Sequence, residues 1–117
     1  MILASIILPL TDNKGQPIAS IHDGLEETLI DLFGGVTSSV RQGAWKHEGK
    51  VYREAVRQYD VFVDETDQGK FYKGVTERAF RYIAQDVGQA AGQIAVSIIV
   101  DGKPEIVTVT YSTPQGE

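Results

Sequence analysis

The chain has 117 residues, with 16 acidic against 11 basic side chains, a formal net charge of -5 and no cysteine. Its apolar fraction of 42% and charged fraction of 23% are ordinary for a globular protein, which excludes collagen-like, coiled-coil and wholly disordered chains. Without cysteine there are no disulfides, thiol catalysis or cysteine-ligated metals, and the acidic balance argues against general affinity for nucleic acid or anionic membranes. The longest apolar run, Ile6–Leu10, is too short to cross a membrane. We therefore expect a soluble, cytoplasmic protein with a single domain over residues 1–117.

The N-terminal part predicts a strand followed by a helix. Ile2–Leu10 is apolar on both faces, which indicates a buried central strand, and it ends at the turn-forming segment Thr11–Gly15. Asp23 with Glu26 three residues later is typical of a helix start with a capping box. Apolar residues then recur at helical spacing, and Gly34 with Gly35 predicts the end of the helix.

Two further strands are predicted over Val36–Trp45 and Val51–Val63, because both segments are rich in β-branched and aromatic residues. The segment between them, Lys46–Lys50, contains a glycine where a hairpin requires positive φ. We expect this five-residue segment to be the loop of a β-hairpin.

A polar loop is expected over Asp64–Gly69, and a second helix over Phe71–Val87. The helix is indicated by an apolar stripe at helical spacing, made of Tyr72, Val75, Ala79, Phe80, Ile83 and Val87. Gly88 and Gly92 lie where this helix is expected to end.

The C-terminal part predicts a second hairpin and a polar tail. Ile94–Val100 and Glu105–Tyr111 are strands joined by the hairpin dipeptide Asp101-Gly102, and Thr113–Glu117 follows as the tail. The order β-α-β-β-α-β-β is the ferredoxin-like plan with one extra C-terminal hairpin strand. We expect an α+β fold in which two helices cover one face of a five-stranded antiparallel sheet of order 2-3-1-4-5. The other face is then either wet or covered by another copy.

The first hairpin carries the most distinctive group of side chains. Side chains alternate between the two faces of a strand, and the expected five-residue loop pairs Trp45 with Val51. Together these place ten residues on one face: Thr37, Ser39, Arg41, Gly43, Trp45, Val51, Arg53, Ala55, Arg57 and Tyr59. Arginine offers bidentate donors to phosphate, and aromatic rings stack on bases. We therefore predict a ligand site formed by Arg41, Trp45, Arg53, Arg57 and Tyr59. A solvated face or a dimer interface would need the same residue types.

The second helix adds weaker candidates. Phe71 opens the helix, where an aromatic ring can stack on a base while free backbone amides meet a phosphate, although it also fits the core stripe. Arg78 and Arg81 are either further phosphate contacts or charges on a solvated helix face.

Motifs of enzymes and metal sites are missing from the sequence. No phosphate-binding glycine loop with Lys-Ser/Thr follows Gly34-Gly35, and no nucleophile elbow is present. The two histidines, His22 and His47, have no third ligand at metal spacing, although either is a possible acid-base group. We expect a protein that is not an enzyme and uses no cofactor or metal.

Several segments together resemble a family of small phage-encoded proteins. The segments are Pro9–Gly15, Leu32–Gly35, Gly43–Lys46 and Gly49–Glu54, and the family is the first Thoeris anti-defence family. The resemblance implies a small α+β homodimer, or a higher homo-oligomer, that acts as a sponge in the cytoplasm of the infected bacterial host. Such proteins bind a cyclic ADP-ribose isomer made by TIR-domain proteins and sequester it without cleaving it.

The resemblance and the residues agree on a compact ligand that needs cations for a pyrophosphate and an aromatic ring for adenine. Two alternatives stay open. One is a small ferredoxin-like cyclic-nucleotide hydrolase that uses His22 or His47. The other is a structural homo-oligomerisation module whose open sheet face pairs with itself.

Overall fold

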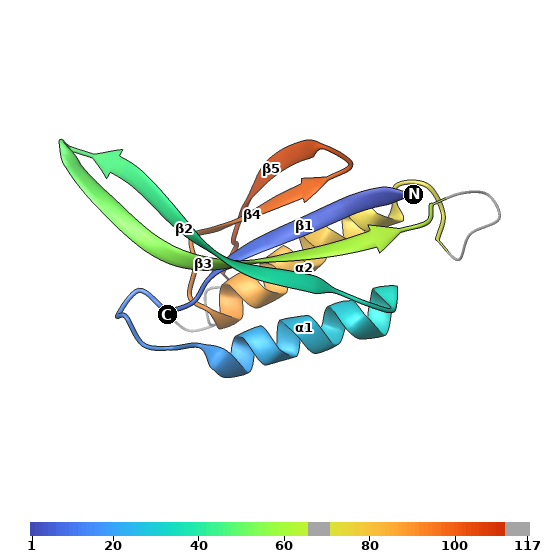
Figure 1. The fold of residues 1–117 in the computed structure, drawn as a ribbon, viewed down its shortest axis with the longest axis horizontal. Helices are drawn as coiled ribbons and strands as arrows, with labels where there is room; N and C mark the ends of the chain where they lie inside the picture. The colour runs from blue at the N-terminus through green and yellow to red at the C-terminus, as the bar shows by residue number, and fades with distance from the viewer. Residues whose placement is uncertain (66–70, 112–117) are drawn as a thin grey trace, which may run out of the picture.

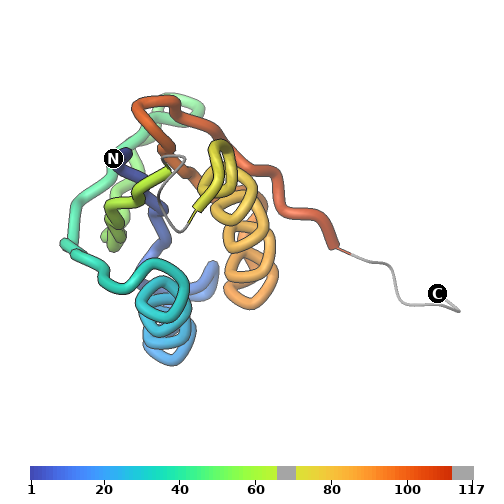
Figure 2. The backbone as a smooth tube through the Cα atoms, turned by 90° about the vertical axis from the view of Figure 1, so that its right-hand side faces the viewer, coloured from blue at the N-terminus to red at the C-terminus, as the bar shows by residue number. Residues whose placement is uncertain are grey.

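The computed structural model describes residues 1–65 and 71–111. Its elements in chain order are β1 (Ile2–Pro9), α1 (Ala19–Phe33), β2 (Thr37–His47), β3 (Lys50–Val63), α2 (Val75–Ala90), β4 (Ala95–Val100) and β5 (Lys103–Thr108). The strands form one sheet of order β2-β3-β1-β4-β5, in which every neighbouring pair is antiparallel. Both helices lie on the same side of this sheet (Figures 1 and 2). The predicted ferredoxin-like α+β fold, with its extra C-terminal strand, is confirmed.

The core lies between the helices and one face of the sheet. Along β1, Ala4, Ile6 and Leu8 point inward and are fully buried, as the period of two requires of a strand packed on one face. Helix α2 meets the sheet with Phe80, and it comes so close at Gly88 that a Cβ there would lie 2.5 Å from a methyl group of Val109. Gly88 is therefore a packing residue inside α2, which ends at Ala90, between Gly88 and Gly92 as predicted.

Helix α1 begins five residues earlier than the capping-box pattern predicted. It starts after Ile18, whose buried side chain anchors the entering chain and whose carbonyl oxygen accepts hydrogen bonds from the amides of Ile21 and His22. Asp23 lies inside the helix, so its predicted capping role is wrong. The helix ends at Gly34 as predicted, where φ is 86° and the amide donates to the Ile30 carbonyl oxygen at 2.8 Å.

Helix α2 begins at Val75, after the predicted first turn. Phe71 and Tyr72 therefore precede the helix, and Tyr72 is exposed. The Glu65 carboxylate accepts hydrogen bonds from the amides of Gly74, at 3.1 Å, and Thr76, at 2.9 Å, and so occupies the helix N-terminus. Most of the predicted Asp64–Gly69 loop, and the predicted tail, lie outside the described residues.

The β2–β3 hairpin is longer than predicted and extends beyond the sheet (Figure 1). Its turn contains only Glu48 and Gly49, with φ of 50° and 78°, which places His47 opposite Lys50. Strand β1 pairs with β3 only from Val56 onward, so no described strand pairs with residues 42–54 other than the hairpin itself. We call residues 41–57, the distal part of this hairpin, the arm.

Candidate functional site

The arm divides the predicted ligand residues between two faces. Directly opposite residues of an antiparallel pair lie on the same face, and Trp45 pairs with Tyr52 while Arg41 pairs with Val56. Arg53 and Arg57 belong to the alternate set, so they face the other side. The predicted single cluster is therefore wrong. A two-residue turn replaces the expected five-residue loop, and the resulting one-residue change of register moves one strand's side chains to the opposite face.

The helix-facing side of the arm holds Arg53 and Arg57, one on either side of Ala55 in the alternating pattern. Arg53 is exposed and lies opposite the small residue Ala44. Arg57 is half-buried, and its Nη1 donates to Ser38 Oγ at 3.3 Å. The two guanidinium groups are separated by Ala55, and Arg53 is faced by Ala44, which leaves space for an anionic group to approach.

Tyr59 continues this side into the core, where it meets His22 of α1. The Tyr59 hydroxyl lies 2.7 Å from His22 Nδ1, and His22 Nε2 lies 2.7 Å from the Pro9 carbonyl oxygen. Because a carbonyl oxygen only accepts, Nε2 carries the proton and Nδ1 accepts from Tyr59. Burial raises the pKa of Tyr59 to about 12, against a smaller lowering by the nearby Arg57 charge. Tyr59 is thus a buried link between β3, α1 and the end of β1.

The open side of the arm carries the aromatic pair. The rings of Trp45 and Tyr52 are stacked, with centroids 5.6 Å apart and an interplanar angle of 15°. Lys50 Nζ lies 5.2 Å from the centroid of the Tyr52 ring. Arg41 shares this side with Trp45. This side therefore offers aromatic surface and cations, but not together with Arg53 and Arg57.

The two candidates from the second helix region lie elsewhere. Phe71 packs against Phe33 at a centroid distance of 5.6 Å, at the margin of the core. Arg78 is exposed on α2, which is a different element from the arm. Phe71 and Arg78 thus lie in a different part of the chain from the arm arginines, and their contribution to one common site stays a prediction.

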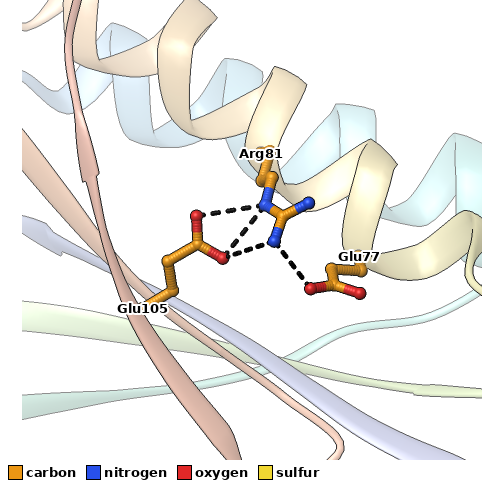
Figure 3. A network of polar contacts seen from close by, with 3 residues as sticks. All are labelled: Glu77, Arg81 and Glu105. Carbon is orange, nitrogen blue, oxygen red and sulfur yellow. Dashed lines mark hydrogen bonds and ion pairs between the residues drawn. The ribbon is translucent and has the colours of Figure 1, made fainter.

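Arg81 is engaged by two carboxylates. Its guanidinium donates to Glu77 Oε1 at 2.7 Å and to both carboxylate oxygens of Glu105 at 3.0 Å (Figure 3). These hydrogen bonds raise the pKa of Arg81. Arg81 thus connects α2 to β5. The sequence left open whether Arg81 is a phosphate contact or a charge on a solvated helix face, and the structure shows it in an ion pair between these two elements.

Sequence reasoning missed two polar contacts on the sheet. The sequence analysis offers His22 only as a possible acid-base group, yet its spacing to Leu25 and Leu29 places all three on the inward stripe of α1. On the open face, Ser5 Oγ donates to Asp60 Oδ1 at 2.5 Å, and Gln58 Nε2 donates to the same oxygen at 3.0 Å. Only knowledge of strand pairing reveals this second group, because Ser5 and Asp60 are 55 residues apart.

Hollows occur away from the predicted residues as well. The groove between α1 and α2 has a volume of about 320 Å³, is mainly apolar and has Asp86 as its single charged lining residue. None of the predicted ligand residues lines it. Among residues 1–65 and 71–111, no group of three or more histidine and carboxylate side chains is arranged to hold a metal, and no helix is long and apolar enough to span a membrane.

Comparison with known proteins shows a similar fold in solved structures of a phage protein. No protein-family model and no curated protein sequence matches the chain. A phage SAM lyase in complex with S-methyl-5'-thioadenosine is similar in structure, with a TM-score of 0.66 and 14% identity over 96% of this chain and 92% of that one. The same lyase in its apo state gives a TM-score of 0.65 at 13% identity. A CutA1 variant from Pyrococcus horikoshii OT3 gives 0.48 at 10% identity. The chain therefore has a fold that is also found in a phage enzyme.

Proposed function

We propose that this chain is a phage-encoded counter-defence protein that binds a small adenine-containing molecule in the cytoplasm of an infected bacterium. The observation that carries the proposal is the backbone match to a phage SAM lyase, which extends over 96% of this chain and includes a complex with an adenine nucleoside.

The preferred ligand is a cyclic ADP-ribose isomer made by TIR-domain proteins, held without cleavage. The arm supports an anionic ligand, because it has five basic residues (Arg41, Lys46, Lys50, Arg53, Arg57) and two acidic ones (Glu48, Glu54), a net charge of +3. Because the net charge of the whole chain is -5, the residues outside the arm carry a net charge of -8. An anion is therefore attracted to the arm and repelled by the remainder. Arg53 and Arg57 on the helix-facing side are the residues that we assign to the phosphates.

Sequestration without turnover is supported by the state of the histidines. Both ring nitrogens of His22 are engaged inside the protein, by Tyr59 and by the Pro9 carbonyl oxygen. His47 lies beside the exposed hairpin turn, where its nearest carboxylate is that of Glu48, 3.7 Å away. A cyclic-nucleotide hydrolase would need one of them as a free acid-base group close to the phosphates, so the hydrolase alternative is the weaker one.

A second candidate function is the chemistry of the neighbour itself, the breakdown of S-adenosylmethionine to S-methyl-5'-thioadenosine. It is favoured by the similarity in fold to a phage SAM lyase that is bound to that nucleoside. A sulfonium substrate carries positive charge where it reacts, so the acidic remainder of the chain would attract it and the basic arm would not. Charge therefore separates the two candidates.

Titration calorimetry combined with mass spectrometry of the solution tests both. Sequestration predicts that the cyclic ADP-ribose isomer binds, disappears from solution and returns intact after heat release. The lyase candidate predicts that S-adenosylmethionine is consumed and S-methyl-5'-thioadenosine accumulates. If none of these three molecules binds or changes, the proposal of an adenine-containing ligand is wrong. The expected homo-oligomer belongs to this proposal too.

A further inference from the structure

The sheet face turned away from the helices exposes apolar side chains from several strands. Leu3 on β1, Phe62 on β3 and Ile106 on β5 are 45%, 64% and 72% exposed. All three belong to the residues that alternate with the buried ones, so they project from the uncovered face. An apolar face that extends over adjoining strands is unusual for a surface that only meets water.

This face is also nearly free of charge. In the described strands of the body, meaning β1, β4, β5 and the parts of β2 and β3 outside the arm, Asp60 is its single charged residue. The Asp60 carboxylate already accepts hydrogen bonds from Ser5 and Gln58. A partner that covers the face would therefore bury little charge that lacks hydrogen bonds.

The face has a projection and a hollow at different places. Phe62 stands on β3, beside Leu3 in the strand pairing. Across β1, at β4 and β5, a hollow of about 360 Å³ is lined mainly by Ile7, Ile99, Pro104 and Ile106, with Ser97 and with Glu105, whose carboxylate accepts hydrogen bonds from Arg81. A phenyl ring and an apolar hollow of this size are complementary, and both belong to the same face of the same chain.

We infer that a second copy of this chain packs on the open sheet face, with Phe62 of each copy directed into the hollow of its neighbour. Two copies that each carry -5 repel one another at long range, so a lasting contact needs a face with little charge, and on this face of the body Asp60 is the single charged residue of the described strands. The same side continues along the arm through Val56 to the stacked Trp45 and Tyr52, which adds aromatic surface beside the charged residues Arg41, Lys50 and Glu54. The inference gives a surface to the homo-oligomer of the proposed function.

The test is the mass of the ligand-free protein in solution, measured by light scattering after gel filtration and by sedimentation. We expect two or more copies of the 12.8 kDa chain. Phe62→Glu, which places a charge on the projection, and Ser97→Trp, which fills the hollow, should each weaken association by about tenfold to a hundredfold. Ile94→Glu is the matched control, because Ile94 is 80% exposed but lies just before β4, outside the lining of the hollow.

Folding of each variant is checked by its far-UV spectrum and melting temperature, since all three positions are exposed. The inference is overturned if the wild-type protein has the mass of one chain, or if Ile94→Glu dissociates it as much as Phe62→Glu. It is also overturned if 1 M salt dissolves the assembly, because that would indicate a basic arm bound to an acidic surface. No nucleotide is present, so the outcome is independent of ligand binding.

Discussion

The arm and the body of this protein are held in different ways. In the body, alternate residues of the central strands are buried under two helices, and the few polar groups among them, such as the Tyr59 hydroxyl, are hydrogen-bonded. Along residues 42–54 of the arm, the two strands pair only with each other, and their side chains are mostly exposed. An isolated two-stranded ribbon is marginal in water. The body therefore supplies the stability, and the arm presents charge and aromatic surface.

The largest difference between the two regions should appear when apolar side chains are truncated. Phe80→Ala removes a fully buried ring from the body and should lower the free energy of unfolding by about 3–5 kcal/mol. Val51→Ala in the exposed part of the arm should change it by no more than about 0.5 kcal/mol. Chemical denaturation measures both. Equal losses would break the comparison, and Phe80→Leu replaces Phe80→Ala if the latter does not fold.

The buried link between β3 and α1 should come next in size. Tyr59→Phe leaves His22 Nδ1 without its donor inside the protein, so we expect a loss of about 1–3 kcal/mol in the free energy of unfolding. Tyr52→Phe is the matched control on the same strand, because Tyr52 is partly exposed in the arm. A Tyr59→Phe protein as stable as the control would show that the hydrogen bond to His22 contributes nothing.

The same residue predicts an alkaline dependence of stability. The pKa of Tyr59 is about 12 in the folded protein, against an ordinary value of 10.0, because burial disfavours the phenolate. Stability that depends on the neutral hydroxyl is complete below pH 10 and is lost as pH rises toward 12. Urea unfolding across this range should show a steeper decline in the wild type than in Tyr59→Phe. Parallel curves for the two proteins would refute the assignment.

A smaller effect is expected where the chain enters α2. Burial alone would raise the pKa of Glu65, but the Thr76 hydroxyl, the amides of Gly74 and Thr76 and the Lys73 charge lower it below its ordinary value of 4.5. The carboxylate therefore stabilises the fold above about that pH, and the contribution is lost on acidification through the lowered pKa. Glu65→Gln should cost about 1 kcal/mol at neutral pH and almost nothing in strong acid. Thermal melts at both pH values test this, and a loss that does not depend on pH would contradict it.

The sequence predicted the sheet order because each strand had an apolar pattern and clear turn residues on either side. The Asp101-Gly102 turn, for example, has the positive φ values of 52° and 77° that its residue types favour. The register of the arm could not be predicted in this way. Its register depended on whether the turn had two residues or five, and the sequence around Gly49 allows both. Exposed strands give no buried face that would decide between them.

The candidate site was predictable in composition but not in geometry. The arginines and aromatic residues do gather in the arm, yet the register separates Trp45 from Arg53. Tyr59 could have been assigned to the core from its place among the alternating residues Val61 and Val63, which are both buried. The burial of His22 could be predicted only if the helix was known to begin at Ala19. The pattern of Asp23 and Glu26 indicated a later start instead.

The most direct test of the account compares arginines on the two sides of the arm. If the helix-facing side holds the anionic part of the ligand, Arg53→Ala should weaken binding of the cyclic ADP-ribose isomer by about 1.5–3 kcal/mol in titration calorimetry, and Arg53→Lys should restore only part of it. Arg41→Ala, on the open side of the same arm, should bind as the wild type does. Wild-type affinity in Arg53→Ala, or an equal loss in Arg41→Ala, would contradict the assignment of the site to the helix-facing side.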